Sequence, residues 1–110
     1  MPSYLKNNVI LVRNPFSDLS SSKVRPAVVV SAPHRSQDLL IVPLTSKVRA
    51  LLDGEFVLMN WSGAGLNVST AVKRGIYTVS PTLVLKQIGN LVVEDADRLD
   101  QSLIDWLGTR

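Results

Sequence analysis

The sequence predicts a small, mostly β protein in which short strands form a barrel that is closed by one C-terminal helix. Apolar runs rich in β-branched residues alternate with turn residues over most of the chain, which is typical of strands. The last segment alone repeats its apolar residues at helical spacing. With 110 residues, the chain has the usual length of one domain, and we expect a single domain over residues 1–110.

The first predicted strand is the apolar run Val9–Val12, which is bounded by asparagines on both sides. The following segment, residues 15–22, consists of turn-forming residues without a sustained period, which favours a hairpin loop. The loop ends beside Lys23 and Arg25 and could fold over both side chains as a lid.

The central predicted strand lies within Lys23–Ser31. Its run Ala27–Val30 is continuously apolar, which indicates burial on both faces. Pro26 has no backbone N–H, and we therefore expect it at the first position of the strand. Arg25 would then lie just before the strand, at the solvent-exposed end of the barrel wall, where it is well placed to bind an anion.

Five further strands are predicted from apolar runs that lie between turn residues. They are Leu39–Leu44, Glu55–Leu58, Leu66–Val72, Ile76–Val79 and Gln87–Leu91. Asp53-Gly54 is a pair favoured in turns that need positive φ. Ser80-Pro81 predicts the start of a short helix, with Ser80 as its cap.

The C-terminal segment predicts an amphipathic helix that begins near Glu94. Its apolar positions recur at helical spacing, and they are Ala96, Leu99, Leu103, Trp106 and Leu107. Acidic residues in its first turn suit the helix dipole, and Gly108 is a suitable terminator.

Composition excludes several kinds of chemistry. The chain has no cysteine, so disulfides, thiolate catalysis and cysteine-bound zinc are excluded. Its single histidine, His34, excludes a multi-histidine metal site within one chain, and we expect neither metal nor cofactor. No apolar run has the length of a membrane span, and the N-terminus lacks a secretion signal, so we expect a cytoplasmic protein.

Charge is divided unevenly along the chain. Residues 1–92 hold ten cations and four anions, a net charge of +6, whereas residues 93–110 hold two cations and five anions, a net charge of −3. A basic body suggests a polyanionic partner, with nucleic acid as the first candidate.

Two predicted strand ends would form a site for phosphate chemistry if their strands are antiparallel neighbours. Arg25 begins one strand, and Thr45-Ser46-Lys47 ends another. A guanidinium and two hydroxyls at one rim suit binding of a phosphodiester. In RNA the 2′-hydroxyl is an internal nucleophile, so the protein need only align it and stabilise charge on phosphorus. The alternatives are an exposed surface arginine and hydroxyls that only bond the backbone.

Other candidate residues each have two interpretations. Trp61 could stack on an RNA base, or it could fill the barrel or a dimer contact. Lys73, like Lys47, could follow a phosphate backbone or simply be solvated. His34 is a candidate general base or a surface residue, and Asp18 and Glu55 are candidate acid or base groups by exclusion.

Six motifs in order resemble the MazF/PemK family of toxin–antitoxin ribonucleases over nearly the whole chain. They are V-I-L-V, N-P-F-S-D, S-K-V-R-P-A-V-V-V-S, I-V-P-L-T-S, W-S-G-A-G-L-N-V-S-T-A-V and V-L-K-Q-I-G-N-L, the last lying before an acidic helix. The combination of K-V-R-P-A-V-V-V-S with P-L-T-S is the most specific part. The chain departs from the family at Asn7-Asn8, where Gly-Asp is usual, and at Leu66–Ser69, which lacks a proline.

The resemblance implies an SH3-like barrel, a homodimer, and metal-independent cleavage of single-stranded RNA to 2′,3′-cyclic phosphate and 5′-hydroxyl ends. The family's catalytic pair falls on Arg25 and Thr45, where Arg25 would stabilise the phosphorane and Thr45 would hold the scissile phosphate. A cognate antitoxin with an acidic tail would be the protein partner. Residues expected to contact substrate are Phe16, Ser17, Lys23, Ser46, Lys47, Trp61 and Lys73.

Two other functions remain open at this point. A toxin of the same fold could act without catalysis by binding a protein target such as gyrase. A degenerate form could be a plain RNA-binding module, which would show salt-sensitive binding without turnover.

Overall fold

The computed structural model describes residues 4–13 and 23–108. These form seven strands, one short 3-10 helix and one α-helix. Their bounds are β1 (Asn8–Arg13), β2 (Val24–Val29), β3 (Leu39–Thr45), β4 (Phe56–Val57), β5 (Ala71–Val72), β6 (Tyr77–Val79), η1 (Pro81–Leu83), β7 (Val84–Asn90) and α1 (Val93–Leu107). Within these described ranges, no helix has both the length and the apolar character needed to cross a membrane.

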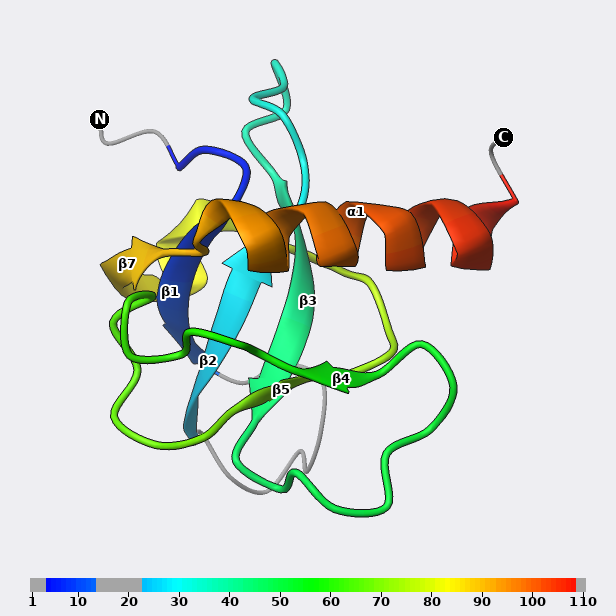
Figure 1. The fold of residues 1–110 in the computed structure, drawn as a ribbon. Coiled ribbons are helices and arrows are strands. Elements are labelled where there is room, and N and C mark those ends of the chain that lie inside the picture. Colours follow the sequence, from blue (N-terminus) through cyan, green and yellow to red (C-terminus); the bar gives the residue numbers. More distant parts are fainter. Residues whose placement is uncertain (1–3, 14–22, 109–110) are drawn as a thin grey trace.

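The strands form one antiparallel sheet in the order β4-β5-β3-β2-β1-β7, and β6 pairs with the first half of β3. The sheet curls, and α1 lies across one of its faces (Figure 1). No pairing joins β4 to β7 in the described part of the chain, so the barrel-like sheet is not closed by hydrogen bonds. The predicted fold class, mostly β with one C-terminal helix, is confirmed.

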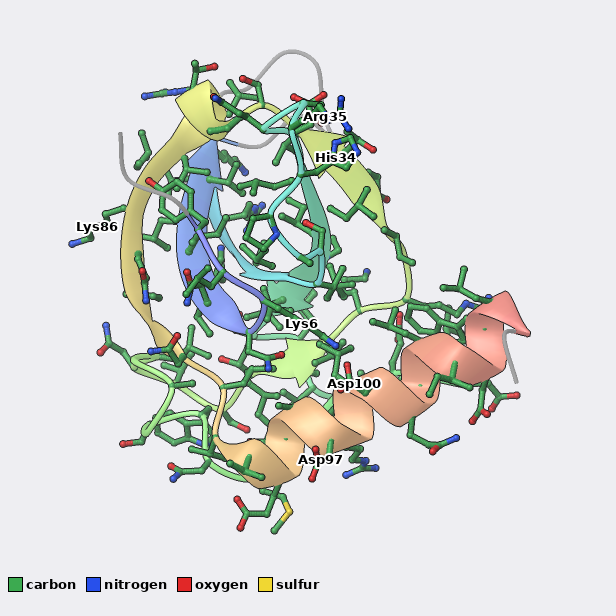
Figure 2. All side chains as sticks on the ribbon, turned by 90° about the horizontal axis from the view of Figure 1, so that it is seen from above. Lys6, His34, Arg35, Lys86, Asp97 and Asp100 are labelled. Carbon is green, nitrogen blue, oxygen red and sulfur yellow. The ribbon has the colours of Figure 1, made fainter. Side chains whose placement is uncertain are left out.

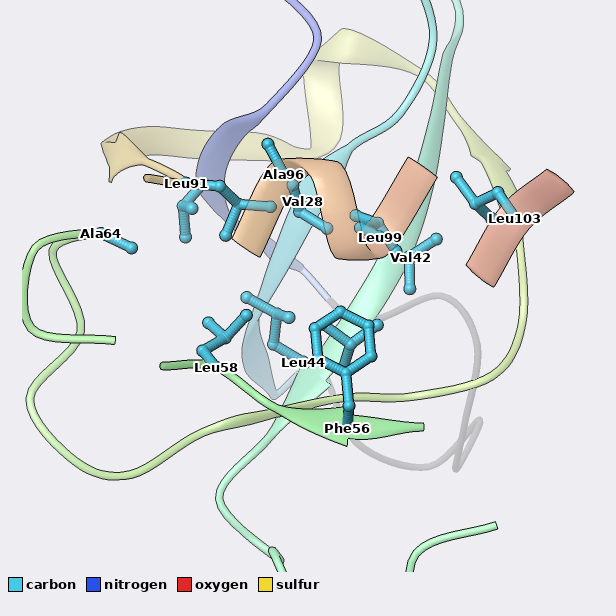
Figure 3. Close-up of a cluster of buried hydrophobic side chains, with 12 residues drawn as sticks. Val28, Val42, Leu44, Phe56, Leu58, Ala64, Leu91, Ala96, Leu99 and Leu103 are labelled. Carbon is cyan, nitrogen blue, oxygen red and sulfur yellow. The ribbon is translucent and has the colours of Figure 1, made fainter. Parts of the chain in front are cut away.

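Two hydrophobic clusters lie on the two faces of the central strands. Val28 and Val42 belong to the cluster beneath α1, together with Leu44, Phe56 and Leu99 (Figure 3). The other cluster takes the alternate residues of the same strands, namely Ile10, Val12, Ala27, Val29, Leu39, Ile41 and Val79. Successive strand residues point to opposite faces, so the continuous apolar run of β2 is buried on both sides as predicted.

The position predicted for Pro26 is wrong. β2 begins at Val24, which makes Pro26 the third residue of the strand. Val30 donates its N–H to Leu40 on β3, so by alternation Pro26 also faces β3. The β2–β3 ladder ends at Ala27, and the missing donor of Pro26 therefore removes no ladder hydrogen bond.

The expected strand over residues 66–72 is also shorter in the structure, where β5 comprises Ala71–Val72. Turn bonds occupy the backbone before it. Leu66 donates its N–H to Trp61, and the Thr70 hydroxyl donates to the Val68 carbonyl. In the preceding segment Gly54 has a φ of +88°, which confirms the predicted turn.

The helix α1 confirms the predicted C-terminal element, and Gly108 ends it with a φ of +64°. Its far end packs on Gly54: the Ser102 hydroxyl donates to the Gly54 carbonyl over 2.9 Å, and the Trp106 indole occupies the space that a Cβ on Gly54 would need. On its exposed side, Asp100 forms a 2.9 Å ion pair with Lys6 (Figure 2).

A buried carboxylate joins the helix to the loop after β4. Asp95 is fully buried and accepts the N–H groups of Met59 and Asn60 over 2.8 and 3.0 Å. Charged acceptors make the stronger hydrogen bonds in proteins. Asp95 therefore fixes the start of the loop that leads through Leu66 to β5.

We expect Asp95→Asn to lower the free energy of unfolding by about 1–3 kcal/mol, because its amide NH₂ would face one of the two N–H donors and leave that donor unpaired. The matched control is Asp97→Asn, an exposed carboxylate on the same helix, which should change stability by less than about 0.5 kcal/mol. Urea unfolding measures both variants. Equal effects would show that Asp95 does not secure the loop.

Candidate functional site

The start of β2 and the end of β3 meet at one edge of the sheet. The two strands are antiparallel, with Ala27 opposite Pro43. The ladder ends at this pair; Arg25 lies two residues before Ala27 and Thr45 lies two residues after Pro43, each within its strand. Residues two apart on a strand project from the same face, so Arg25 shares a face with Ala27, and Thr45 shares that face with Pro43. The guanidinium and the hydroxyl therefore leave the sheet on the same face at this edge.

A pocket of about 560 Å³ opens at this edge. Its lining residues are Arg25, Pro26, Pro43, Leu44, Thr45, Ser46, Lys47, Leu66, Val68, Thr70, Lys73, Arg74 and Tyr77. Four of these described lining residues are cations and none is acidic, whereas the rest supply hydroxyls and an apolar surface. The pocket is therefore suited to an anion that carries an apolar group.

The third wall of the pocket comes from residues 71–79, which run antiparallel beside β3. Leu44 lies opposite Val72, and Ile41 lies opposite Tyr77. Between these two pairs the segment has four residues, 73–76, whereas β3 has only two, 42 and 43. The extra residues bulge out of the sheet, and such bulges re-aim side chains. The Lys73 N–H bonds the Pro43 carbonyl over 2.9 Å just before the bulge. Lys73, Arg74 and Tyr77 are thereby brought to the rim.

Thr45 also holds its own turn. Its Oγ1 accepts the N–H of Lys47 over 3.1 Å, a local side-chain bond that ends the strand. A hydroxyl that accepts a hydrogen bond retains its proton for donation. Thr45 can therefore orient Lys47 and still donate to an anion in the pocket.

Glu55 lies beside the turn that contains Lys73 and Arg74, and it does not belong to the pocket lining. It accepts the N–H groups of Leu52 and Arg74 over 2.8 and 3.1 Å. The Leu52 N–H, followed by the Arg74 N–H and the charges of Lys73 and Arg74, holds the pKa of Glu55 below its usual range, although partial burial opposes this. A carboxylate that stays ionised at neutral pH is unsuited to act as a general acid.

Several sequence-predicted residues lie elsewhere. Lys23 is exposed just before β2 and does not line the pocket, and Trp61 packs partly buried against the core cluster beneath α1. Phe16, Ser17 and Asp18 lie outside the described residues.

His34 is on the loop at the far end of the β2–β3 hairpin (Figures 1 and 2). There its Nδ1 lies 2.9 Å from the Ser36 hydroxyl. The length of β3, about 20 Å, separates that loop from the rim, so the structure does not bring His34 to Arg25 and Thr45 as a general base. In residues 4–13 and 23–108, no group of three or more His, Asp or Glu is placed to hold a metal ion.

Sequence reasoning missed Tyr77 and the apolar wall of the pocket formed by Leu66 and Val68. The run Ile76–Val79 was recognisable as a strand, but its partner strand was not. Pairing of β6 with β3 is a contact between distant parts of the chain, and it alone places Tyr77 at the rim.

Comparison with solved structures shows the same fold in bacterial toxins. A mycobacterial endoribonuclease in complex with its cognate antitoxin superposes with a TM-score of 0.77 at 17% identity, covering 98% of each chain. MazF from Deinococcus radiodurans gives 0.76 at 18% identity, covering 98% of this chain and 99% of its own. Mycobacterium tuberculosis toxin MazF-mt6 gives 0.71 at 20% identity, covering 92% and 96%.

A sequence search of curated proteins finds no match. A family model is more sensitive, because it describes the residue pattern shared by many members. The model for the PemK-like, MazF-like toxin of type II toxin-antitoxin systems matches residues 7–107. The match includes the rim and the whole sheet, and the chain therefore belongs to the PemK/MazF-like toxin family.

Proposed function

We propose that the protein is a metal-independent endoribonuclease that cleaves single-stranded RNA, inhibits growth, and is the toxin of a type II toxin–antitoxin pair. The observation that carries this proposal is that Arg25 and Thr45 line one cationic pocket at this edge of the sheet. The mycobacterial structural relative is itself an endoribonuclease, which supports the same class of reaction.

In the proposed reaction the 2′-oxygen attacks the adjacent phosphorus while the bond from phosphorus to the 5′-oxygen breaks. The 2′-hydroxyl gives up its proton and the departing 5′-oxygen gains one, so the products are a 2′,3′-cyclic phosphate and a 5′-hydroxyl. Arg25 stabilises the extra negative charge on the pentavalent phosphorus with a fork of donors and assists proton transfer. Thr45 holds a non-bridging oxygen and fixes the phosphate in line.

The remaining cations extend this site along a polynucleotide. Lys47 follows the strand end at Thr45, Lys73 follows the neighbouring strand β5, and Ser46 adds a hydroxyl to the same pocket lining. Such cations bind neighbouring phosphates without reading sequence. Lys23 and Trp61 keep their proposed roles as substrate contacts outside this pocket, and Phe16 and Ser17, which lie outside the described residues, also stay proposed substrate contacts.

We propose two protein partners. The first is a cognate antitoxin whose acidic tail lies over the basic rim, since an acidic peptide complements the pocket cations. The MazF relative from Deinococcus radiodurans is also known in complex with MazE, and the mycobacterial relative with its antitoxin. The second partner is another copy of this chain. The reaction would take place in the cytoplasm, where the RNA is.

Arg25→Ala is expected to lower kcat on RNA about 10²- to 10³-fold, because one transition-state donor is lost. Arg25→Lys keeps the charge without the bidentate fork and should recover part of the activity. Incubation of mixed-sequence RNA in EDTA, followed by sequencing of fragments with 5′-hydroxyl ends, measures the rate and the cleavage motif together.

Arg35→Ala is the matched control, because Arg35 is an exposed arginine on the loop at the other end of the hairpin (Figure 2). It should cleave like the wild type. If folded wild-type protein leaves RNA intact while Arg25→Ala remains toxic in cells, the protein acts by binding a target protein instead.

Thr45→Ala should lower kcat/KM about 10- to 100-fold, since a hydrogen bond to a charged oxygen is worth roughly 1.5–3 kcal/mol. Thr45→Ser keeps the hydroxyl that both accepts from Lys47 and donates to the phosphate, and it should remain within about threefold of the wild type. Single-turnover cleavage of a labelled oligonucleotide compares them. A serine variant as poor as the alanine variant would argue against the hydroxyl as the working group.

A further inference from the structure

We propose that Tyr77 is a specificity-determining residue that stacks on a nucleobase next to the cleaved phosphate. This inference rests on the proposed function for its substrate class, single-stranded RNA. It gives the apolar side of the pocket the role of holding a base, beside cations that hold phosphates.

The position of Tyr77 follows from sheet register. Tyr77 lies opposite Ile41 on β3, and directly opposed residues share a face. Ile41 and Thr45 also share that face, because they are four positions apart on β3 and side chains alternate between faces. Measured along β3, the backbone of Ile41, which Tyr77 faces, is about 13 Å from that of Thr45, with Pro43 between them. Tyr77 and Thr45 both line the same pocket.

The Tyr77 ring is supported on one edge and partly open to solvent. A Cβ on Gly75 would lie 3.1 Å from Cε1 and 3.5 Å from the hydroxyl oxygen of Tyr77, so the ring edge rests on the glycine backbone. Gly75 has a φ of +151°, a conformation that residues with side chains rarely adopt. The residue is nevertheless 38% exposed. An aromatic surface is therefore held in place and presented to the pocket.

The chemistry around the ring favours a base over other apolar groups. Lys73 and Arg74 precede Tyr77 on the same bulged segment, and Leu66 and Val68 form the apolar wall of the pocket. Cations for phosphates beside an aromatic face for a base are the usual combination in single-strand binding sites. Stacking on Tyr77 would tolerate several bases but favour the larger ones, which biases the cleavage motif at one position.

Binding to two uncleavable 12-mers of equal charge tests this inference without relying on catalysis. One is a mixed-sequence 2′-O-methyl RNA, which lacks the attacking hydroxyl, and the other is fully abasic. Tyr77→Leu keeps apolar bulk without a π face. It should weaken binding of the base-bearing 12-mer about 5- to 100-fold and change the affinity for the abasic 12-mer by less than twofold.

Three variants separate stacking from other roles. Tyr77→Phe keeps the ring, so the ratio of its affinities for the base-bearing and the abasic 12-mer should stay within about twofold of the wild-type ratio. Thr78→Ala, on the opposite face of the same strand, should also match the wild type. Lys73→Ala should weaken both 12-mers alike, since it removes a phosphate contact.

The inference is overturned if Tyr77→Leu weakens both 12-mers equally or neither, or if Tyr77→Phe loses as much as Tyr77→Leu. The proposed function is decided separately by cleavage of mixed-sequence RNA in parallel. Loss of base-dependent binding in a protein that does not cleave would retain the stacking role and reject the ribonuclease. Cleavage with an unchanged base preference in Tyr77→Leu would do the reverse.

Discussion

The hydrogen-bonded register between β2 and β3 is the constraint on which the other features of this protein depend. Ala27 opposite Pro43 orients each strand so that alternate residues enter the two hydrophobic clusters. The same alternation brings Arg25 and Thr45 to one face at the strand ends. A slip of one residue would move the valines of β2 to the wrong clusters and separate the guanidinium from the hydroxyl. Core packing and the rim therefore specify the same register.

Two of the described carboxylates, Asp95 and Glu55, hold backbone groups in place. Asp95 accepts two N–H groups of the loop after β4, and Glu55 accepts one from its own turn and one from Arg74. Glu55 thereby holds the turn that contains Lys73 and Arg74 beside the pocket, while its own carboxylate stays outside the pocket lining. Glu55 offsets part of the charge of Lys73 and Arg74, but no described carboxylate lines the pocket, so the rim keeps the positive potential that an anion-binding surface requires.

The rim gathers cations that repel one another in the absence of a ligand. Arg25 comes from β2, Lys47 follows β3, and Lys73 and Arg74 belong to the bulged segment. Ladder and backbone hydrogen bonds hold these segments in place, and the Glu55 carboxylate beside Lys73 and Arg74 offsets part of the repulsion. An incoming polyanion would relieve this repulsion, which makes complementarity of charge a shared property of the proposed RNA substrate and the proposed acidic antitoxin tail.

The amino-acid sequence by itself determined the mostly β class, the segment Ala27–Val29 of β2 that is buried on both faces, the turn at Gly54 and the helix that ends at Gly108. These features depend on periodicity and on local backbone preferences, which neighbouring residues specify. The family resemblance, now supported by the family match, also came from motifs that are contiguous in the chain.

Tertiary structure decided which residues from distant parts of the chain lie next to one another. Pro26 lies inside β2 because the ladder on its β3 side has ended, and residues 66–70 lie outside β5, where the Thr70 carbonyl accepts the distant Leu58 N–H. Tyr77 reaches the rim through pairing with Ile41, whereas Trp61 packs on the core and His34 lies at the distant loop. Such contacts join residues far apart in the chain, and their free energy depends on the packing of the whole sheet rather than on any local pattern.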